Sequence, residues 1–185
     1  MQLTHDELVE ARSTVRRGLD EDLRYGPDIT TIATVPADQV STAAMVSRAD
    51  GVAAGIDVAL LTLDEVLGAD GYRVLGRADD GDRLRRGDAL LTLEADTRGL
   101  LTAERTMLNL VCHLSGIATA TSHWVDAVDG TRARIRDTRK TLPGLRALQK
   151  YAVRVGGGVV KIGAMTTHAA VSSQKFSLKV KPSAA

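Results

Sequence analysis

The stretch Asp137-Thr138-Arg139-Lys140-Thr141 joins an alternating segment, Ala133-Arg134-Ile135-Arg136, to a helix-like segment. Alternation of apolar and polar residues predicts a strand over 133–138, and apolar residues at helical spacing predict a helix over 143–155. Three glycines at 156–158 follow this helix, and glycine commonly ends helices. The sequence therefore predicts a β-α unit with the quoted stretch at its turn.

The side chains of this stretch suit the capture of a small polyanion. Arg139 and Lys140 place two cations next to each other, with the hydroxyls of Thr138 and Thr141 and the carboxylate of Asp137 beside them. Arginine grips a carboxylate with two parallel hydrogen bonds, and lysine adds a compact charge on a flexible stem. A solvated charge cluster at the end of a strand would have the same composition. These five residues alone leave both interpretations open.

Charge is distributed unevenly along the chain, although the formal net charge is only +1. No Asp or Glu follows Asp137, whereas nine Lys or Arg residues do, so residues 1–137 carry a net charge of −8 and residues 138–185 a net charge of +9. Such asymmetry is typical of a basic tail or of an anion-binding half. In the predicted helix, Arg146, Lys150 and Arg154 lie four residues apart and form a basic stripe, either solvated or phosphate-binding.

The composition is that of a globular protein with an aliphatic core. Hydrophobic residues make up 44% of the 185 positions and aromatic residues only 3%, which argues against single-stranded nucleic-acid binding. The small net charge gives no reason to expect nucleic acid or an anionic membrane as a partner. No apolar run approaches the ~20 residues of a membrane-spanning helix, and the N-terminus lacks a signal-peptide pattern. The single Cys112 is expected in the core and cannot form an internal disulfide, so a cytoplasmic location is expected.

The residues before the quoted stretch predict a mixed helix and strand domain. Thr4 and Glu7 have the spacing of a capping box, and the first helix places Leu8, Ala11, Val15 and Leu19 on one face. Turn signals and apolar patterns then predict strands at 42–47, 72–75 and 89–94 and helices at 56–67 and 100–114. Ser115-Gly116 is expected to interrupt the last of these helices, with a second helix continuing to Gly130.

Several blocks of sequence accompany the quoted stretch in a fixed order. They are Asp20-Glu21-Asp22-Leu23, Gly26-Pro27-Asp28-Ile29-Thr30-Thr31, Gly51-Val52-Ala53-Ala54-Gly55, Glu104-Arg105-Thr106-Met107-Leu108-Asn109-Leu110, Leu114-Ser115-Gly116-Ile117-Ala118-Thr119 and Lys150-Tyr151-Ala152-Val153-Arg154-Val155-Gly156-Gly157-Gly158. In this order and spacing the blocks resemble the quinolinate phosphoribosyltransferase family, also called the carboxylating nicotinate-nucleotide pyrophosphorylases. The resemblance runs from about Leu8 to Val159. Residues 160–168 lack the Asn-His-Arg run and the following lysine of the family.

The resemblance implies an α/β fold in which an N-terminal α/β sandwich domain precedes an α/β barrel, with the active site at the C-terminal ends of the barrel strands. Residues 1–115 then form the sandwich domain with its long helix, residues 116–159 begin an incomplete barrel, and residues 160–185 form a divergent basic tail. A barrel typically needs ~250 residues. The 55 residues after Gly130 are therefore expected to supply only the first β-α unit of a truncated barrel. The tail alternates Phe176, Leu178 and Val180 with polar residues, and is expected either to add a strand to the open edge of that unit or to stay disordered.

The resemblance also implies a reaction. A phosphoribosyl group passes from 5-phosphoribosyl-1-pyrophosphate to quinolinate with decarboxylation, giving nicotinate mononucleotide, carbon dioxide and pyrophosphate for NAD biosynthesis. Arg105, Thr138, Arg139 and Lys140 are then the substrate-binding residues, and Lys140 is also catalytic. Arg105 is expected to reach the active site of a neighbouring subunit in a homodimer, unless it pairs locally with Glu104 or with another partner on a helix face. Mg²⁺ is expected together with phosphoribosyl pyrophosphate, although no metal-ligand spacing occurs in the sequence.

Two other interpretations stay open. A non-catalytic interaction or dimerisation fragment of the same family would keep the sandwich domain and the long helices without turnover. A molybdenum-transport-associated homologue of the same fold matches the blocks less well. Because the family's His-Arg pair and second lysine do not follow Val159 in their expected context, little or no phosphoribosyl transfer is expected from this chain alone.

Overall fold

The computed structural model describes residues 1–160 and 176–182 of the chain. The described elements follow one another as α1 (His5–Asp22), α2 (Ile29–Thr34), β1 (Val40–Ser47), β2 (Gly51–Val52), α3 (Ile56–Leu67), β3 (Tyr72–Arg77), β4 (Arg83–Leu84), β5 (Ala89–Asp96), α4 (Thr97–Ala127), α5 (Arg146–Val155) and β6 (Phe176–Pro182). The mixture of helices and strands agrees with the predicted α/β class.

A four-stranded antiparallel sheet with the strand order β3-β5-β1-β6 forms one layer of the molecule. Ala43 of β1 lies opposite Leu93 of β5 on one side and opposite Val180 of β6 on the other. Because side chains alternate along a strand, Ala43 and Met45 turn together with Leu91 and Leu93 into the core. A second sheet pairs the short strands β2 and β4.

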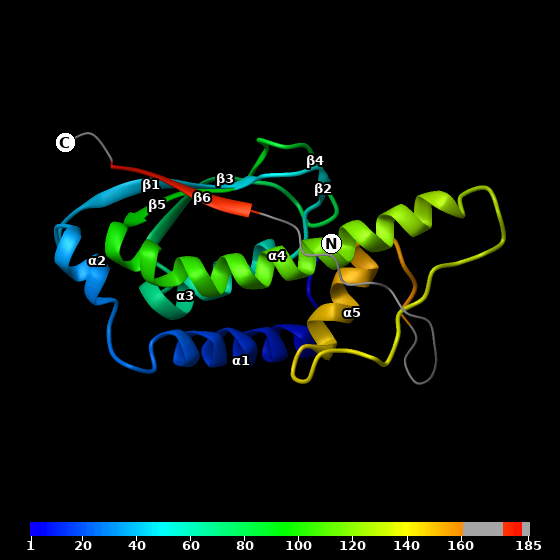
Figure 1. The fold of residues 1–185 in the computed structure, drawn as a ribbon, viewed down its shortest axis with the longest axis horizontal. Helices are drawn as coiled ribbons and strands as arrows, with labels where there is room; N and C mark the ends of the chain where they lie inside the picture. The colour runs from blue at the N-terminus through cyan, green and yellow to red at the C-terminus, as the bar shows by residue number, and fades with distance from the viewer. Residues whose placement is uncertain (161–175, 183–185) are drawn as a thin grey trace.

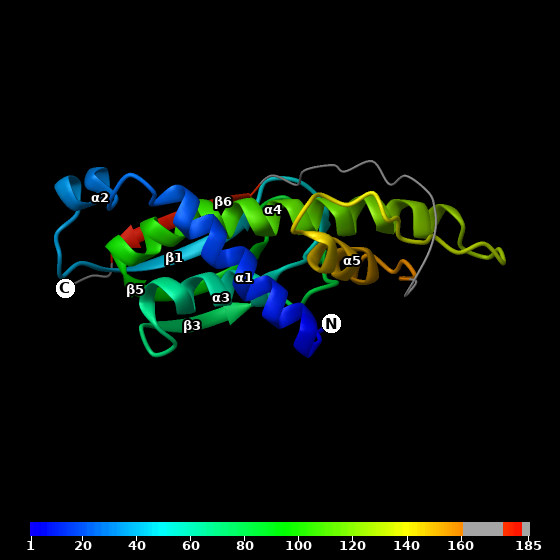
Figure 2. The ribbon, with the colours of Figure 1, turned by 90° about the horizontal axis from the view of Figure 1, so that it is seen from below.

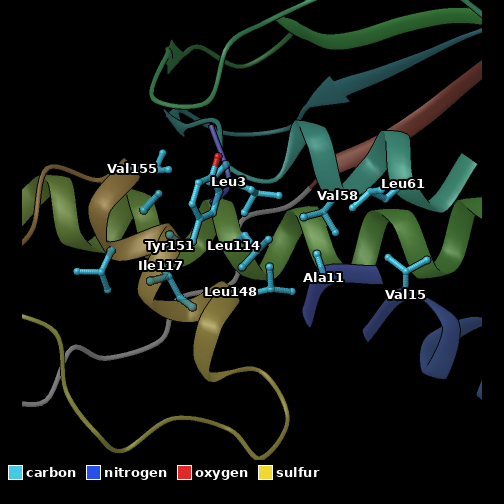
Figure 3. Packing of buried hydrophobic residues seen from close by; sticks show 14 of the residues in the cluster. Leu3, Ala11, Val15, Val58, Leu61, Leu114, Ile117, Leu148, Tyr151 and Val155 are labelled. Atoms are coloured by element: carbon cyan, nitrogen blue, oxygen red, sulfur yellow. The ribbon is translucent and has the colours of Figure 1, made fainter. Parts of the chain in front are cut away.

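The helices α3 and α4 cover the sheet, and α1 packs against the far side of this helical layer (Figures 1 and 2). One apolar cluster fills the space between sheet and helices, with Met45, Leu93 and Met107 among its buried members. A second cluster joins α1, α3, α4 and α5, and Figure 3 shows Leu114 and Tyr151 within it. The sandwich and the start of the next unit therefore share α4 as a common support.

The first helix begins as the sequence predicts. Thr4 Oγ1 accepts a hydrogen bond from the Glu7 amide at 3.3 Å, and Glu7 Oε2 accepts one from the Thr4 amide at 2.9 Å, which completes the capping box. Ala11 is buried on the predicted face, but Leu8 remains 38% exposed at its edge. The capping box is confirmed, and the inclusion of Leu8 in the apolar face is wrong.

The helix α4 runs without interruption for 31 residues and corrects the expected break at Ser115-Gly116. The Ser115 hydroxyl is buried and donates to the Ala54 carbonyl at 3.0 Å, while the Ala54 amide donates to Ser115 Oγ at 2.9 Å. These two bonds attach the helix to the loop before α3. Tertiary contacts of this kind override the weak helix propensity of serine and glycine.

The segment 133–138 is not a strand, because its ladder consists of one parallel bridge between Arg136 and Val159. Around this bridge the Val159 amide donates to the Ile135 carbonyl at 2.8 Å, and the Asp137 amide donates to the Val159 carbonyl at 3.1 Å. A regular strand needs a partner along several residues, and Val159 is the described residue that pairs here. The following helix begins at Arg146, later than the predicted 143, because Gly144 has a positive φ of 76° in the preceding turn.

The predicted strand in the tail exists but joins a different edge from the expected one. Over its length β6 pairs antiparallel with β1, so it extends the sheet of the sandwich and not the 133–138 segment. Phe176 is buried in the sheet-facing cluster, with Leu178 and Val180 packed against that cluster. The β1 edge offers both unpaired backbone groups and an apolar surface, and together these explain the pairing. The remaining residues of the tail, 161–175 and 183–185, lie outside the described residues.

Candidate functional site

The cationic loop, defined here as residues 138–141, lies between the bridged segment and α5 (Figure 1). Arg139 and Lys140 are exposed, and Thr138 is half-buried. Thr138 Oγ1 accepts a hydrogen bond from the Lys140 amide at 3.1 Å, a local side-chain turn that closes the loop on itself. The two predicted cations are therefore adjacent and open to solvent.

Asp137 precedes the cationic loop and is removed from solvent. Its carboxylate forms an ion pair with the Lys150 ammonium of α5, with the Asp137 side chain 6% and the Lys150 side chain 22% exposed. A buried carboxylate needs such a partner. Arg139 and Lys140 lie on the exposed face of the loop, and Lys150 pairs with Asp137 beneath it.

The first turn of α5 also holds the other end of the loop. Gln149 Oε1 accepts a hydrogen bond from the Leu142 amide at 3.1 Å, and Gln149 Nε2 lies 2.8 Å from His113 Nε2 of α4. Arg146 Nε donates to Thr141 Oγ1 at 3.3 Å. Two consecutive residues, Gln149 and Lys150, thus fix both ends of the loop to α5.

The predicted basic stripe on α5 turns out to be a row of internal contacts. Lys150 binds Asp137, Arg146 binds Thr141, and Arg154 donates to both carboxylate oxygens of Glu7 on α1. Burial acts to raise the pKa of Glu7, but the hydrogen bonds from Arg154 and Thr4 outweigh it and hold this pKa below its usual value. The stripe is therefore divided: Lys150 and Arg154 form ion pairs within the chain, whereas Arg146 is exposed, as the solvated interpretation predicts.

The position of α5 depends on a buried network that the sequence did not reveal. Asp80 caps the N-terminus of α3 by accepting from the Gly55 amide at 2.9 Å and the Ile56 amide at 3.0 Å, and it also accepts from the Tyr151 hydroxyl of α5. Burial raises the pKa of Tyr151, and the neighbouring Asp80 carboxylate raises it further. At the other end of α5, the backbone of Gly156 approaches α4 so closely that a Cβ would lie 2.4 Å from the Ala118 carbonyl oxygen.

Arg105 pairs across two helices and not with its neighbour. Its guanidinium donates to the carboxylate of Asp22 at the end of α1, which corrects the local alternative of a pair with Glu104. Burial raises the pKa of Glu104, and the positive charge of Arg105 opposes that shift. The Arg105 side chain remains 73% exposed, so it is accessible to a ligand or to another chain.

Two hollows border Arg105. One of about 740 Å³ lies between α4 and the 22–31 segment. Another of about 640 Å³ lies between α1 and α4 and extends to Pro143 and Leu145 at the start of α5. Neither hollow includes Thr138, Arg139 or Lys140 among its described lining residues. Within one chain, these hollows do not unite Arg105 with the cationic loop.

The described residues contain no group of three or more His, Cys, Asp or Glu side chains arranged to hold a metal ion. Cys112 is half-buried beside the sheet-facing cluster, and burial raises the pKa of its thiol. Among the described helices, none combines the length and the apolar character that a membrane crossing requires.

Comparison with known protein families identifies two matching domains. The N-terminal domain of quinolinate phosphoribosyl transferase matches residues 28–115, and the C-terminal domain of the same family matches residues 117–175. The helix α4 spans the position where the two matches meet. The second match extends beyond Val159, where the sequence resemblance was expected to end.

Individual relatives agree with the domain matches. The chain is 72% identical over 157 residues to the carboxylating nicotinate-nucleotide pyrophosphorylase of Mycobacterium leprae, and the match covers 85% of this chain and 55% of that protein. It is 43% identical over 133 residues to a probable enzyme of the same name from Methanothermobacter thermautotrophicus, covering 71% of this chain and 46% of the relative. The chain thus spans about half the length of these relatives.

Solved structures give the same result. The NadC structure from Streptococcus pyogenes superimposes with a TM-score of 0.78 at 36% identity, covering 88% of this chain and 55% of that one. The nicotinate-nucleotide pyrophosphorylase structure from Francisella tularensis gives a TM-score of 0.76 at 33% identity, with coverages of 86% and 55%.

Proposed function

The chain belongs to the quinolinate phosphoribosyltransferase family, and on that premise we propose that its cationic loop binds quinolinate. In the family reaction the ring nitrogen of quinolinate attacks the anomeric carbon of 5-phosphoribosyl-1-pyrophosphate, and pyrophosphate leaves. The 2-carboxyl group then departs as carbon dioxide from a ring whose nitrogen carries positive charge, and nicotinate mononucleotide remains. A protein that promotes this reaction must hold two carboxylates and stabilise developing charge.

The observation that carries this proposal is the exposure of two adjacent cations on a loop that is held at both ends. Lys150 neutralises the buried Asp137, while Arg139 and Lys140 remain exposed on a loop fixed at both ends. A guanidinium fork and an ammonium side by side match a dicarboxylate in charge and in hydrogen-bond geometry. Arg139 then binds a carboxylate, Lys140 is the catalytic cation, and the half-buried Thr138 shapes the loop.

The proposal extends to a homodimer in which Arg105 completes the site of the partner subunit. Two observations support this part of the proposal: Arg105 is exposed, and the hollows that it lines do not include the cationic loop of the same chain.

Magnesium with phosphoribosyl pyrophosphate also belongs to the proposal. The described carboxylates and histidines do not fit a metal site of their own. Magnesium commonly binds substrate phosphates with only one or two protein carboxylates. A cytoplasmic location completes the proposal and rests on the single cysteine.

Isothermal titration calorimetry with quinolinate tests the site directly. Arg139→Ala and Lys140→Ala are each expected to weaken binding by about tenfold or more, because a hydrogen bond to a charged group contributes roughly 1.5–3 kcal/mol. Arg86→Ala, an exposed arginine in a turn of the sandwich, serves as the matched control. Equal affinity in all three variants would show that quinolinate binds elsewhere.

Turnover is expected to be low for the 185-residue chain by itself. No Asp or Glu follows Asp137 in its sequence, and the described residues present no metal-ligand cluster. Loss of even one preorganised charge-stabilising group costs roughly 3–4 kcal/mol of transition-state stabilisation. Pyrophosphate release with quinolinate, phosphoribosyl pyrophosphate and Mg²⁺ measures this, with the Mycobacterium leprae relative as the positive control. A rate on the order of 1 per second would contradict the expectation.

A second candidate function is self-association without turnover. Two apolar side chains that line the hollow between α4 and the 22–31 segment are exposed, Tyr25 at 95% and Ile29 at 74%, and Ile32 on the same helix α2 as Ile29 is 47% exposed. Exposed apolar groups that gather on one surface commonly mark a protein interface. Light scattering at several protein concentrations measures whether the chain forms a dimer, as both the catalytic proposal and this second candidate require. Ile29→Asp is expected to dissociate a dimer formed through this surface. A wild-type chain that stays monomeric at every concentration would remove both dimeric proposals.

A further inference from the structure

A short chain of hydrogen bonds connects α4 to the cationic loop through the side-chain amide of Gln149. This residue is only 6% exposed, and both ends of its amide are engaged. Its Oε1 accepts from the Leu142 amide at 3.1 Å, and its Nε2 lies 2.8 Å from His113 Nε2. Leu142 is the first residue after the cationic loop, so the contact holds the loop where it leaves toward α5.

The chemistry of the groups fixes the direction of each hydrogen bond. A backbone N–H is always a donor, so the oxygen of Gln149 must face Leu142. The amide nitrogen therefore faces His113, and this nitrogen carries two hydrogens and accepts none. His113 Nε2 must then be the acceptor, which requires a neutral imidazole with its proton on Nδ1. The backbone of Leu142 thus determines the protonation state that suits His113.

The surroundings of His113 favour this neutral form. Burial lowers its pKa, and none of the described charged groups contributes to that shift. Charged groups on α5, α1 and α4 and in the segment before α5 have these contacts: Lys150 pairs with Asp137, Arg154 with Glu7 and Arg105 with Asp22, Arg146 donates to Thr141 Oγ1, and Arg17 donates to the Gly144 carbonyl. In this setting the imidazole serves as an uncharged acceptor.

We propose that His113 and Gln149 are positioning residues of the cationic loop, and that protonation of His113 loosens the loop and weakens quinolinate binding. An imidazolium has N–H donors at both nitrogens, so its Nε2 hydrogen meets the amide hydrogens of Gln149. The Gln149 side-chain amide then either loses its hydrogen bond with His113 or rotates so that its oxygen accepts from the His113 Nε2 hydrogen. This rotation places the NH₂ group of Gln149 against the N–H of Leu142, and two donors cannot bond to each other. A hydrogen bond from a charged donor is the stronger one, so the turned state prevails and Leu142 is released.

The proposed effect has a definite sign with pH. The hydrogen bonds from His113 through Gln149 to the Leu142 amide are called the brace here. Because the pKa of His113 in the folded chain lies below its usual value, the brace is complete when the pH is above the usual histidine pKa. It is lost as the pH falls through the pKa of the folded chain. The quinolinate part of the inference rests on the proposed function, whereas the brace itself does not. The test therefore has one arm without quinolinate and one arm with it.

The first arm is an NMR titration of the ¹⁵N-labelled full chain from about pH 8 to pH 5. It follows the imidazole nitrogens of His113, the side-chain amide of Gln149 and the backbone amide of Leu142. We expect all three to change with one common midpoint. His123 is exposed on the same helix, and His123→Gln serves as the control because it should leave the response of the Leu142 amide to pH unchanged. A Leu142 amide that stays constant while His113 titrates would overturn the brace.

The second arm measures quinolinate affinity across the same pH range. Wild-type affinity is expected to fall about three- to tenfold as His113 is protonated, the equivalent of one lost hydrogen bond. His113→Gln retains a hydrogen-bond acceptor that cannot take up a proton. Its quinolinate affinity should therefore not show the additional fall at low pH that is expected for wild type. His113→Leu should bind weakly at every pH, and His123→Gln should behave like wild type. Protonation of quinolinate itself affects every variant equally and cancels in this comparison.

The two arms separate the failure of this inference from the failure of the proposed function. If wild type and His113→Gln show the same pH dependence of quinolinate affinity, His113 does not position the site. If no variant binds quinolinate at any pH, the proposed function and the affinity part of this inference fail together. The NMR titration still decides in that case whether His113 and Gln149 hold the loop.

Discussion

The sandwich and the cationic loop are built on different physical principles. The sandwich is held by many overlapping apolar contacts, with Met45, Leu91, Leu93 and Met107 almost fully buried between sheet and helices. The stretch from the end of α4 to the start of α5 contains no regular helix or strand and is fixed by a small number of polar contacts, chiefly those of Gln149 and Lys150. In the sandwich, the remaining apolar contacts still hold the structure when one contact is lost. In the cationic loop, loss of one polar contact directly weakens the attachment of the loop. The proposed site therefore lies where local stability depends on individual side chains.

The sandwich core should give the largest single effect on stability. Leu93→Ala removes most of a side chain that is 1% exposed and leaves a cavity, so the free energy of unfolding should fall by about 3 kcal/mol. Urea denaturation followed by circular dichroism measures the change. Leu75→Ala on β3 is the matched control, because Leu75 is 46% exposed and should change stability by less than about 0.5 kcal/mol.

The ion pair before the loop should follow in size. Lys150→Met removes the Lys150 ammonium from the buried Asp137 carboxylate, and the free energy of unfolding is expected to fall by about 2 kcal/mol. This is less than for a fully buried pair, because the Lys150 side chain is 22% exposed. The double variant Asp137→Asn with Lys150→Met should recover part of this loss. Lys181→Met on β6, which is exposed, is the control. A loss as small as that of the control would mean that the pair does not hold the loop.

The contact between α1 and α5 should make stability depend on pH. The pKa of Glu7 is lower in the folded chain than its usual value, so its contribution is complete above that usual value and is lost as pH falls through the folded pKa. Chemical denaturation at pH 7 and at about pH 3 should show a smaller decline for Glu7→Gln than for wild type. Glu10→Gln on the exposed side of α1 should leave the decline unchanged.

The smallest effect is expected at the pair between Arg105 and Asp22. Arg105 is 73% exposed, and exposed ion pairs contribute at most about 1 kcal/mol, so Asp22→Asn should barely change the unfolding midpoint. The exposed pair of Arg83 and Asp126 provides a comparison through Asp126→Asn. A marked loss of stability in Asp22→Asn alone would show that Arg105 has a structural role in its own chain.

Local patterns in the sequence correctly predict local structure. The capping box of Thr4 and Glu7 and the helix predicted at 56–67 both follow from residues close together in the chain. The membership of the family followed from the order of separated blocks, which a fold preserves even when single motifs are ambiguous. Arg139 and Lys140 were also placed correctly at the turn before α5, although their role in binding remains a prediction.

Predictions of strands and helix ends were wrong where the structure depends on contacts between residues that are far apart in the sequence. The alternation at 133–138 resembles a strand, but a strand exists only where a neighbour pairs with it, and the structure supplies one bridge to Val159. The alternation around Phe176 is a strand because β1 provides an edge. Ser115 stays inside a helix because its hydroxyl bonds to Ala54, 61 residues away.

The sequence by itself determined the capping box of Thr4 and Glu7, the helix at 56–67, the aliphatic character of the core and the uneven distribution of charge, because these depend on neighbouring residues and on composition. Only the tertiary structure decided which charges pair across the fold and which charged side chains lie exposed. It paired Lys150 with Asp137, Arg154 with Glu7 and Arg105 with Asp22, and left Arg139 and Lys140 exposed on the loop. The physical reason is that a charge acts on whatever lies within a few ångströms of it, and the fold alone sets those distances between residues that are far apart in sequence.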